Sequence, residues 1–87
     1  MLDIIIEIYE DETFLKADGY DDAIIGVEEH SMRLIYSVKK CIEIIMFDPI
    51  NKTLQMTEEE ALEFFNYNVS GAYLGSKTPI WCYDYFN

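Results

Sequence analysis

Residues 23–47 read AIIGVEEHSMRLIYSVKKCIEIIMF, and this stretch changes from strand-like to helix-like patterning. Residues 23–28 are short, apolar and rich in β-branched side chains, which favours a strand. Gly26 lies inside that run and indicates a bulge or a close backbone approach. A turn at 29–31 separates it from a second apolar run at 32–36. We therefore expect the two runs to pair as a hairpin.

The second half of the stretch predicts a helix over 38–47. From Val38 onward, apolar residues recur at three-to-four spacing, which is the pattern of an amphipathic helix. Ser37 stands just before the pattern, and its hydroxyl can accept a hydrogen bond from an early helical N–H group. Asp48-Pro49 is expected to end the helix, because the residue before proline avoids the helical region.

A second helix is predicted after Thr57, where the chain reads TEEEALEFF. Thr57 and Glu60 have the spacing of a capping box, in which each side chain bonds the other's backbone N–H group. Three glutamates in the first turn also suit the helix dipole. Apolar residues continue the helical spacing as far as Ala72, and Gly71 or Gly75 is expected to end the helix.

Three further runs are interpreted as strands: 3–9, 13–17 and 80–86. An Asp-Gly turn at 18–22 precedes the hairpin, and glycine there suits a positive φ. The predicted element order is ββββ-α-α-β. The sequence thus predicts one α+β domain over 1–87, with a small antiparallel sheet of four to five strands and two helices packed on one face.

The formal charge of −11 is unevenly distributed along the 87 residues. Residues 1–29 hold ten acidic residues against one base, Lys16, so this third of the chain carries −9 of the charge. Direct nucleic-acid binding is disfavoured, because phosphate contacts need many Lys and Arg side chains and there are six. Such asymmetry keeps a protein soluble or steers it towards a basic partner.

Other function classes lack their sequence signals. No stretch approaches the roughly 20 apolar residues of a membrane helix, and the N-terminus has no secretory signal, so we expect a cytoplasmic protein. Cys41 and Cys82 stand far apart and are interpreted as buried or half-buried thiols. There is no GxSxG, P-loop or GxGxxG motif. We therefore expect a non-enzymatic protein without catalytic residues, metal ligands or a cofactor.

The candidate partner-binding residues fall into two groups. The first is acidic and surrounds the hairpin, and the second is aromatic and lies near the C-terminus, where such side chains often anchor interfaces. The acidic group is Asp18, Asp21, Asp22, Glu28 and Glu29, and the aromatic group is Tyr73, Trp81, Tyr83 and Tyr85.

Three alternatives remain open. The carboxylates of residues 18–22 are of the type that binds a divalent cation, although the EF-hand spacing is absent. A pocket between the sheet and the helices, near Tyr20, Asn66 and Tyr73, would instead make the chain a small-ligand binder. An exposed edge strand would allow a structural homodimer.

Three segments together resemble an uncharacterised group of small hypothetical proteins from bacteriophage and prokaryotic genomes. These are 18–27 (DGYDDAIIGV), 36–45 followed by 56–61 (MTEEEA), and 68–75 followed by Thr78-Pro79-Ile80. The resemblance covers residues 14–82 and brings no known activity. It implies a phage accessory protein. We therefore expect an inhibitor that presents its acidic face to a basic, nucleic-acid-binding host protein.

Overall fold

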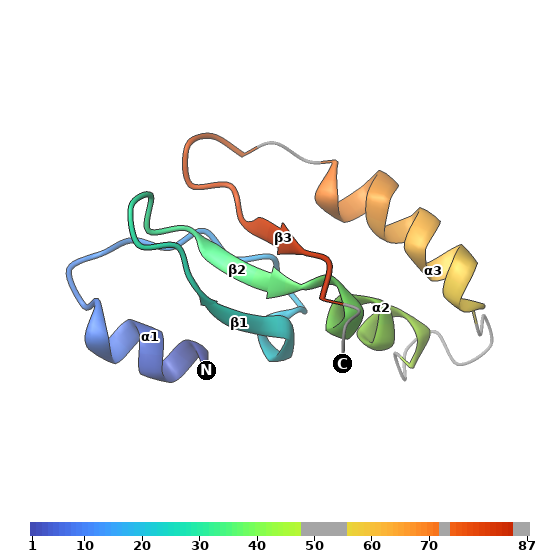
Figure 1. The fold of residues 1–87 in the computed structure, drawn as a ribbon, viewed down its shortest axis with the longest axis horizontal. Coiled ribbons are helices and arrows are strands. Elements are labelled where there is room, and N and C mark those ends of the chain that lie inside the picture. Colours follow the sequence, from blue (N-terminus) through green and yellow to red (C-terminus); the bar gives the residue numbers. More distant parts are fainter. Residues whose placement is uncertain (48–55, 72–73, 85–87) are drawn as a thin grey trace.

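The computed structural model describes residues 1–47, 56–71 and 74–84. In these ranges the chain forms short helices and a small sheet, drawn in Figure 1. The elements are α1 (Leu2–Ile8), the 3-10 turn η1 (Asp21–Ala23), β1 (Ile24–Val27), β2 (Leu34–Ser37), α2 (Val38–Met46), α3 (Glu58–Phe65), the π-helical turn η3 (Asn66–Ser70) and β3 (Ile80–Cys82).

The described strands form one mixed sheet in the order β1-β2-β3. β1 and β2 pair antiparallel, which confirms the predicted hairpin. The register shifts between Ile24 and Gly26, so the pairing is irregular at the position where Gly26 indicates a bulge. β3 pairs with β2 in parallel. The chain between them is long enough for such a crossover and carries α2 and α3.

The predicted antiparallel sheet of four to five strands in the order ββββ-α-α-β is therefore wrong. The largest error is at residues 3–9, which form the helix α1 and not a strand. Their alternation is imperfect, because Ile4, Ile5 and Ile6 are consecutive. The helix buries Ile5 and packs Leu2, three residues earlier, against the core. Side chains three apart share a helix face but point to opposite sides of a strand.

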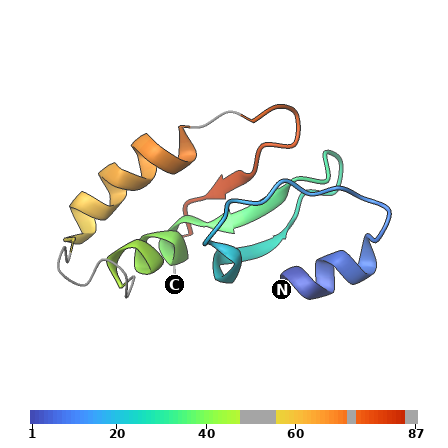
Figure 2. The ribbon, with the colours of Figure 1, turned by 180° about the vertical axis from the view of Figure 1, so that it is seen from behind.

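The other predicted outer strands also differ from the structure. Residues 13–17 run as irregular chain, and the Ala17 N–H group donates to the Tyr36 hydroxyl at 2.8 Å. Figure 2 shows this segment crossing the sheet. The last strand is only three residues long; residues 83–84 of the predicted range run as irregular chain, and residues 85–86 lie outside the described part.

Both central helices begin where the sequence predicts. The Ser37 Oγ accepts a hydrogen bond from the Lys40 N–H group at 3.1 Å and caps α2. The capping box is present at α3: Thr57 Oγ1 accepts from Glu60 N at 3.2 Å, and Glu60 Oε1 accepts from Thr57 N at 3.0 Å. η3 follows α3 and ends at Gly71. The predicted stop at Asp48-Pro49 lies outside the described residues.

An aromatic cluster joins the sheet to α3. The Trp81 ring lies 5.1 Å from the Tyr36 ring and 5.2 Å from the Phe65 ring, measured between centroids. Tyr36 and Phe65 are fully buried. This cluster holds α3 against one face of the sheet. The opposite face of α3 therefore points outward.

Two simpler expectations can be compared with the structure. Cys41 is buried and Cys82 is partly buried, and both thiols are free, as expected. In the described part of the chain, no helix has the length and apolar character needed to cross a membrane.

Candidate functional site

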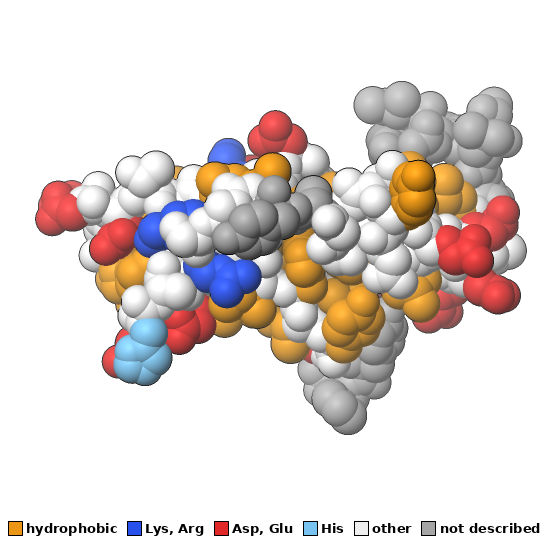
Figure 3. Space-filling model, turned by 90° about the horizontal axis from the view of Figure 1, so that it is seen from above, with side chains coloured by type: hydrophobic (Ala, Val, Ile, Leu, Met, Phe, Trp, Pro, Cys, Tyr) orange, Lys and Arg blue, Asp and Glu red, His pale blue; other side chains and the backbone are white. Residues whose placement is uncertain are grey.

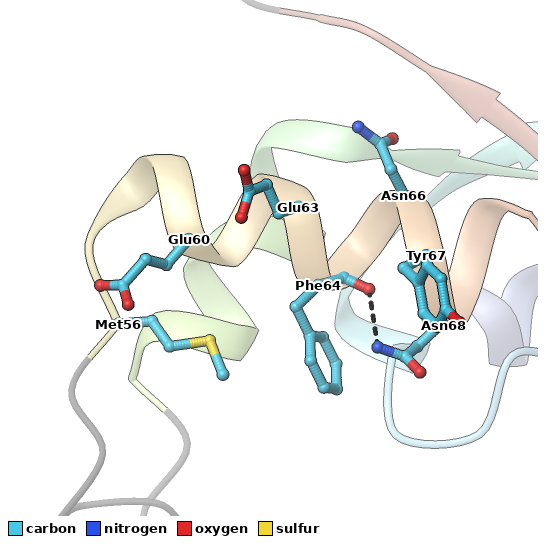
Figure 4. A pocket seen from close by; sticks show the side chains of 7 residues that line it. All are labelled: Met56, Glu60, Glu63, Phe64, Asn66, Tyr67 and Asn68. Atoms are coloured by element: carbon cyan, nitrogen blue, oxygen red, sulfur yellow. Dashed lines mark hydrogen bonds between the residues drawn. The ribbon is translucent and has the colours of Figure 1, made fainter.

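The outer face of α3 combines acidic and apolar side chains. Ala61 and Phe65 point into the core, which turns Glu60, Glu63 and Phe64 outward. Glu60, Glu63, Phe64 and, further along in η3, Tyr67 are all exposed and form a strip along the helix, and Figure 4 shows how each side chain projects from it. The strip follows from the three-to-four spacing of residues 60, 63, 64 and 67.

An open hollow of about 730 Å³ lies along this strip, and we name it the α3 hollow. Phe64 is 39% exposed and Tyr67 is 87% exposed, so both aromatic rings are available to a ligand. The Asn68 side-chain amide donates to the Phe64 carbonyl at 3.2 Å (Figure 4). The lining residues are Met56, Glu60, Glu63, Phe64, Asn66, Tyr67 and Asn68.

A second hollow of about 170 Å³ adjoins the first, and we name it the turn hollow. It shares Met56 and Phe64 with the α3 hollow and reaches the predicted Asp-Gly turn. Gly19 has a φ of +91°, so the positive φ expected for this turn is confirmed. The lining residues are Asp18, Gly19, Tyr20, Ile44, Ile45, Met56 and Phe64. The two hollows together are called the acidic groove.

The acidic groove carries negative charge around an apolar floor. Its carboxylates are Asp18, Glu60 and Glu63, and among the described residues that line it none is basic. Figure 3 shows carboxylates gathered at the end of the molecule where α3 begins, beside hydrophobic side chains. Lys16 pairs with Asp21 at 3.8 Å, and Lys77 pairs with Glu12 at 3.4 Å. Neither neutralises a groove carboxylate.

The four other acidic candidates, Asp21, Asp22, Glu28 and Glu29, do not line the acidic groove. Asp21 and Asp22 are exposed in η1, and Asp22 lines a further hollow with Lys40, Glu43, Ile44 and Phe47. Glu29 is exposed in the hairpin turn. The Glu28 carboxylate accepts hydrogen bonds from the Ser31 hydroxyl at 2.6 Å and the Ser31 N–H group at 2.5 Å. These bonds, led by the hydroxyl, lower the pKa of Glu28 to about 2. Glu28 therefore closes its own turn.

Of the two aromatic candidates that the structure describes, Trp81 packs against the core and Tyr83 is exposed. Trp81 packs inward between Tyr36 and Phe65. Tyr83 is 51% exposed, and its hydroxyl donates to the Asn66 side-chain oxygen at 3.1 Å, which links the C-terminal chain to η3. Tyr73 and Tyr85 lie outside the described residues.

The structure bears on both the ligand and the cation alternative. Tyr20 and Asn66 line different hollows, but Tyr20 also lines a hollow of about 230 Å³ with Asn68 of η3 and Trp81 of β3; the third proposed residue, Tyr73, is outside the described part. Within the described ranges, no three His, Cys, Asp or Glu side chains come together as metal ligands.

Sequence reasoning missed the apolar floor of the groove. Met56, Phe64 and Tyr67 were not among the predicted binding residues. A signal was present, because Phe64 and Phe65 are adjacent in a helix and cannot both face the same core. The helix phase set by Ala61 and Phe65 leaves Phe64 outside.

Comparisons with protein-family models, with curated proteins and with solved structures returned no match for this chain.

Proposed function

We propose that the protein is a non-enzymatic acidic binding protein that engages a basic, nucleic-acid-binding protein of a host cell. The observation that carries this proposal is the acidic groove, where carboxylates surround exposed apolar side chains and no described lining residue is basic. The resemblance to small phage proteins supports an accessory or inhibitory role. Carboxylates offered at phosphate-like positions compete for a basic surface, and the complementary fields speed association.

The Asp18 turn contributes to the same field. Asp18 lines the groove, while Asp21 and Asp22 are exposed just beyond it. Lys16 lies beside Asp21, but both side chains are solvent-exposed, and such a pair neutralises little of the local field. A basic partner would therefore meet the turn and the α3 carboxylates on one continuous surface.

Affinity capture from a bacterial lysate tests the proposal, with the chain immobilised through a C-terminal tag. We expect the retained proteins to be basic, to be released as salt rises, and to be displaced by duplex DNA. The variant with Asp18→Asn, Asp21→Asn and Asp22→Asn should retain several-fold less of the same proteins. Loss of charge–charge steering and contact is the physical reason.

A charge-matched control replaces three acids near the other end of the molecule: Asp3→Asn, Glu7→Gln and Glu10→Gln. It removes the same charge, and the exposed α1 segment lies far from α3 (Figure 1). The proposal requires this control to retain its partners. The proposal is contradicted if the retained proteins resist release by salt and by DNA. It is also contradicted if the Asp18 turn variant and the control retain equal amounts of them.

A further inference from the structure

We infer that the acidic groove takes a basic amphipathic helix, which lies along α3 with its apolar residues against Met56, Phe64 and Tyr67. This inference rests on the proposed function and names the chemistry of the partner segment. A surface that only imitated phosphates would need carboxylates alone. Here the floor between the carboxylates is apolar, and Tyr67 is the most exposed of the large hydrophobic side chains described.

The shape of the site favours a helix as the occupant. α3 and η3 together run from residue 58 to residue 70, which is about 20 Å at an ordinary helical rise. The outward side chains at 60, 63, 64 and 67 line the α3 hollow in one row along α3 and η3, so a second helix laid along that row would contact all four. A partner helix of about 14 residues matches this length. Recognition of a helix by a complementary apolar surface is a common peptide-binding mode.

The turn hollow gives the partner helix a place to anchor. Met56 and Phe64 line both hollows, and Tyr20 and Ile44 line the turn hollow with them. An aliphatic side chain of the partner that entered the turn hollow would lose its water on binding. Burial of such an anchor is where interface energy concentrates.

The charge pattern decides which partner fits. Glu60 and Glu63 lie on α3, and Asp18 lines the turn hollow. Lys or Arg residues flanking the apolar stripe of a partner helix would meet these carboxylates. A second copy of this chain does not fit, because α3 carries four glutamates and no base and would oppose its own charges. An uncharged apolar segment would leave the carboxylates desolvated without partners.

Fluorescence anisotropy with two labelled synthetic peptides tests this inference on the full chain. One is a 14-residue amphipathic helix of leucine and lysine, and the other is a 14-residue oligolysine. We expect the leucine–lysine peptide to bind more tightly. We expect Phe64→Ala and Tyr67→Ala each to weaken it by about tenfold, with little effect on oligolysine.

The matched control for apolar truncation is Ile8→Ala, because Ile8 is 63% exposed on α1 at the other end of the molecule. The charge comparison sets Asp18→Asn with Glu63→Gln against Asp3→Asn with Glu7→Gln. Circular dichroism of each variant verifies folding, and the high exposure of Tyr67 protects that variant from a folding defect.

The outcomes separate the inference from the proposed function. If both peptides bind equally and neither aromatic truncation matters, the apolar floor is not used and the inference is overturned, while a purely electrostatic acidic surface survives. If only the groove variants lose the leucine–lysine peptide, the inference is supported. If neither peptide binds and lysate capture also fails, both the inference and the proposed function are overturned.

Discussion

Glu28 shows how a single carboxylate can serve local structure instead of recognition. Its two hydrogen bonds from Ser31 close the β1–β2 turn, and the pKa of Glu28 falls from 4.5 to about 2 because the bonds favour the charged form. Since the pKa is lower in the folded state, the ionised carboxylate stabilises the fold above pH 4.5. That contribution is lost as pH falls towards 2.

Ser31→Ala should raise the Glu28 pKa towards 4.5, because it removes the hydroxyl bond that contributes most to the shift. A carboxyl-carbon NMR titration measures the pKa directly. Ser31→Thr keeps the hydroxyl and serves as the control, with the low pKa retained. An unchanged titration in Ser31→Ala would show that the Ser31 hydroxyl does not hold the carboxylate.

At the element scale, residues 2–8 form the helix α1, although their isoleucine-rich composition favours a strand. The helix buries Ile5 and packs Leu2, three residues earlier, against the same core, whereas a strand would point these two side chains to opposite faces. Ile5→Ala should lower the free energy of unfolding by about 2 kcal/mol. Ile6→Ala should change it little, since alanine is the better helix former.

Urea denaturation of these two variants measures the difference. Ile6 is 50% exposed and Ile5 is 4% exposed, so the pair matches side-chain chemistry and differs in burial. The reverse order, with Ile6→Ala the more destabilising, would contradict the burial of Ile5 in α1 and would favour a strand that buries Ile4, Ile6 and Ile8 instead.

The capping box makes a similar prediction for α3. Thr57→Ala removes the acceptor of the Glu60 N–H group and should cost about 1 kcal/mol of unfolding free energy. Thr57→Ser keeps the hydroxyl and should be close to neutral. Thermal or urea unfolding gives the values. Equal losses in both variants would mean that the cap contributes little to the start of α3.

The sequence predicts local structure best where one residue type has one physical role. Ser37, Thr57 and Gly19 act as predicted, because a cap or a positive φ depends on near neighbours. The same holds for α2 and the hairpin. The parallel pairing of β3 depends on how the α2–α3 segment crosses back, which no local pattern specifies.

The candidate site was predictable only in part. Asp18, Asp21 and Asp22 are exposed as acidic candidates should be, whereas Trp81 is used in the aromatic cluster. The groove itself joins a turn and a helix some 40 residues apart in the sequence. Hydrophobic spacing indicated which side of α3 faces the core, but not that Phe64 would meet the Asp18 turn.

At the scale of the whole molecule, net charge opposes compactness. With a charge of −11, like charges repel more strongly in the folded state than in the expanded chain. Raising sodium chloride from about 10 to 150 mM shortens the Debye length from about 30 to 8 Å. The urea midpoint should therefore rise with salt.

The variant with Asp3→Asn, Glu7→Gln and Glu10→Gln provides the control for this salt effect. It reduces the formal charge by three, so its midpoint should rise less over the same salt range. A midpoint that falls with added salt would mean that attractive ion pairs outweigh repulsion in the folded state.

The most direct test of the acidic groove is a two-dimensional NMR titration of the isotope-labelled chain with the leucine–lysine peptide. The groove predicts the largest amide shifts in α3, η3 and residues 18–20, with α1 unaffected. Phe64→Ala should reduce these shifts at equal peptide concentration. Shifts concentrated on α1, or spread evenly over every acidic residue, would contradict a groove built from α3 and the Asp18 turn.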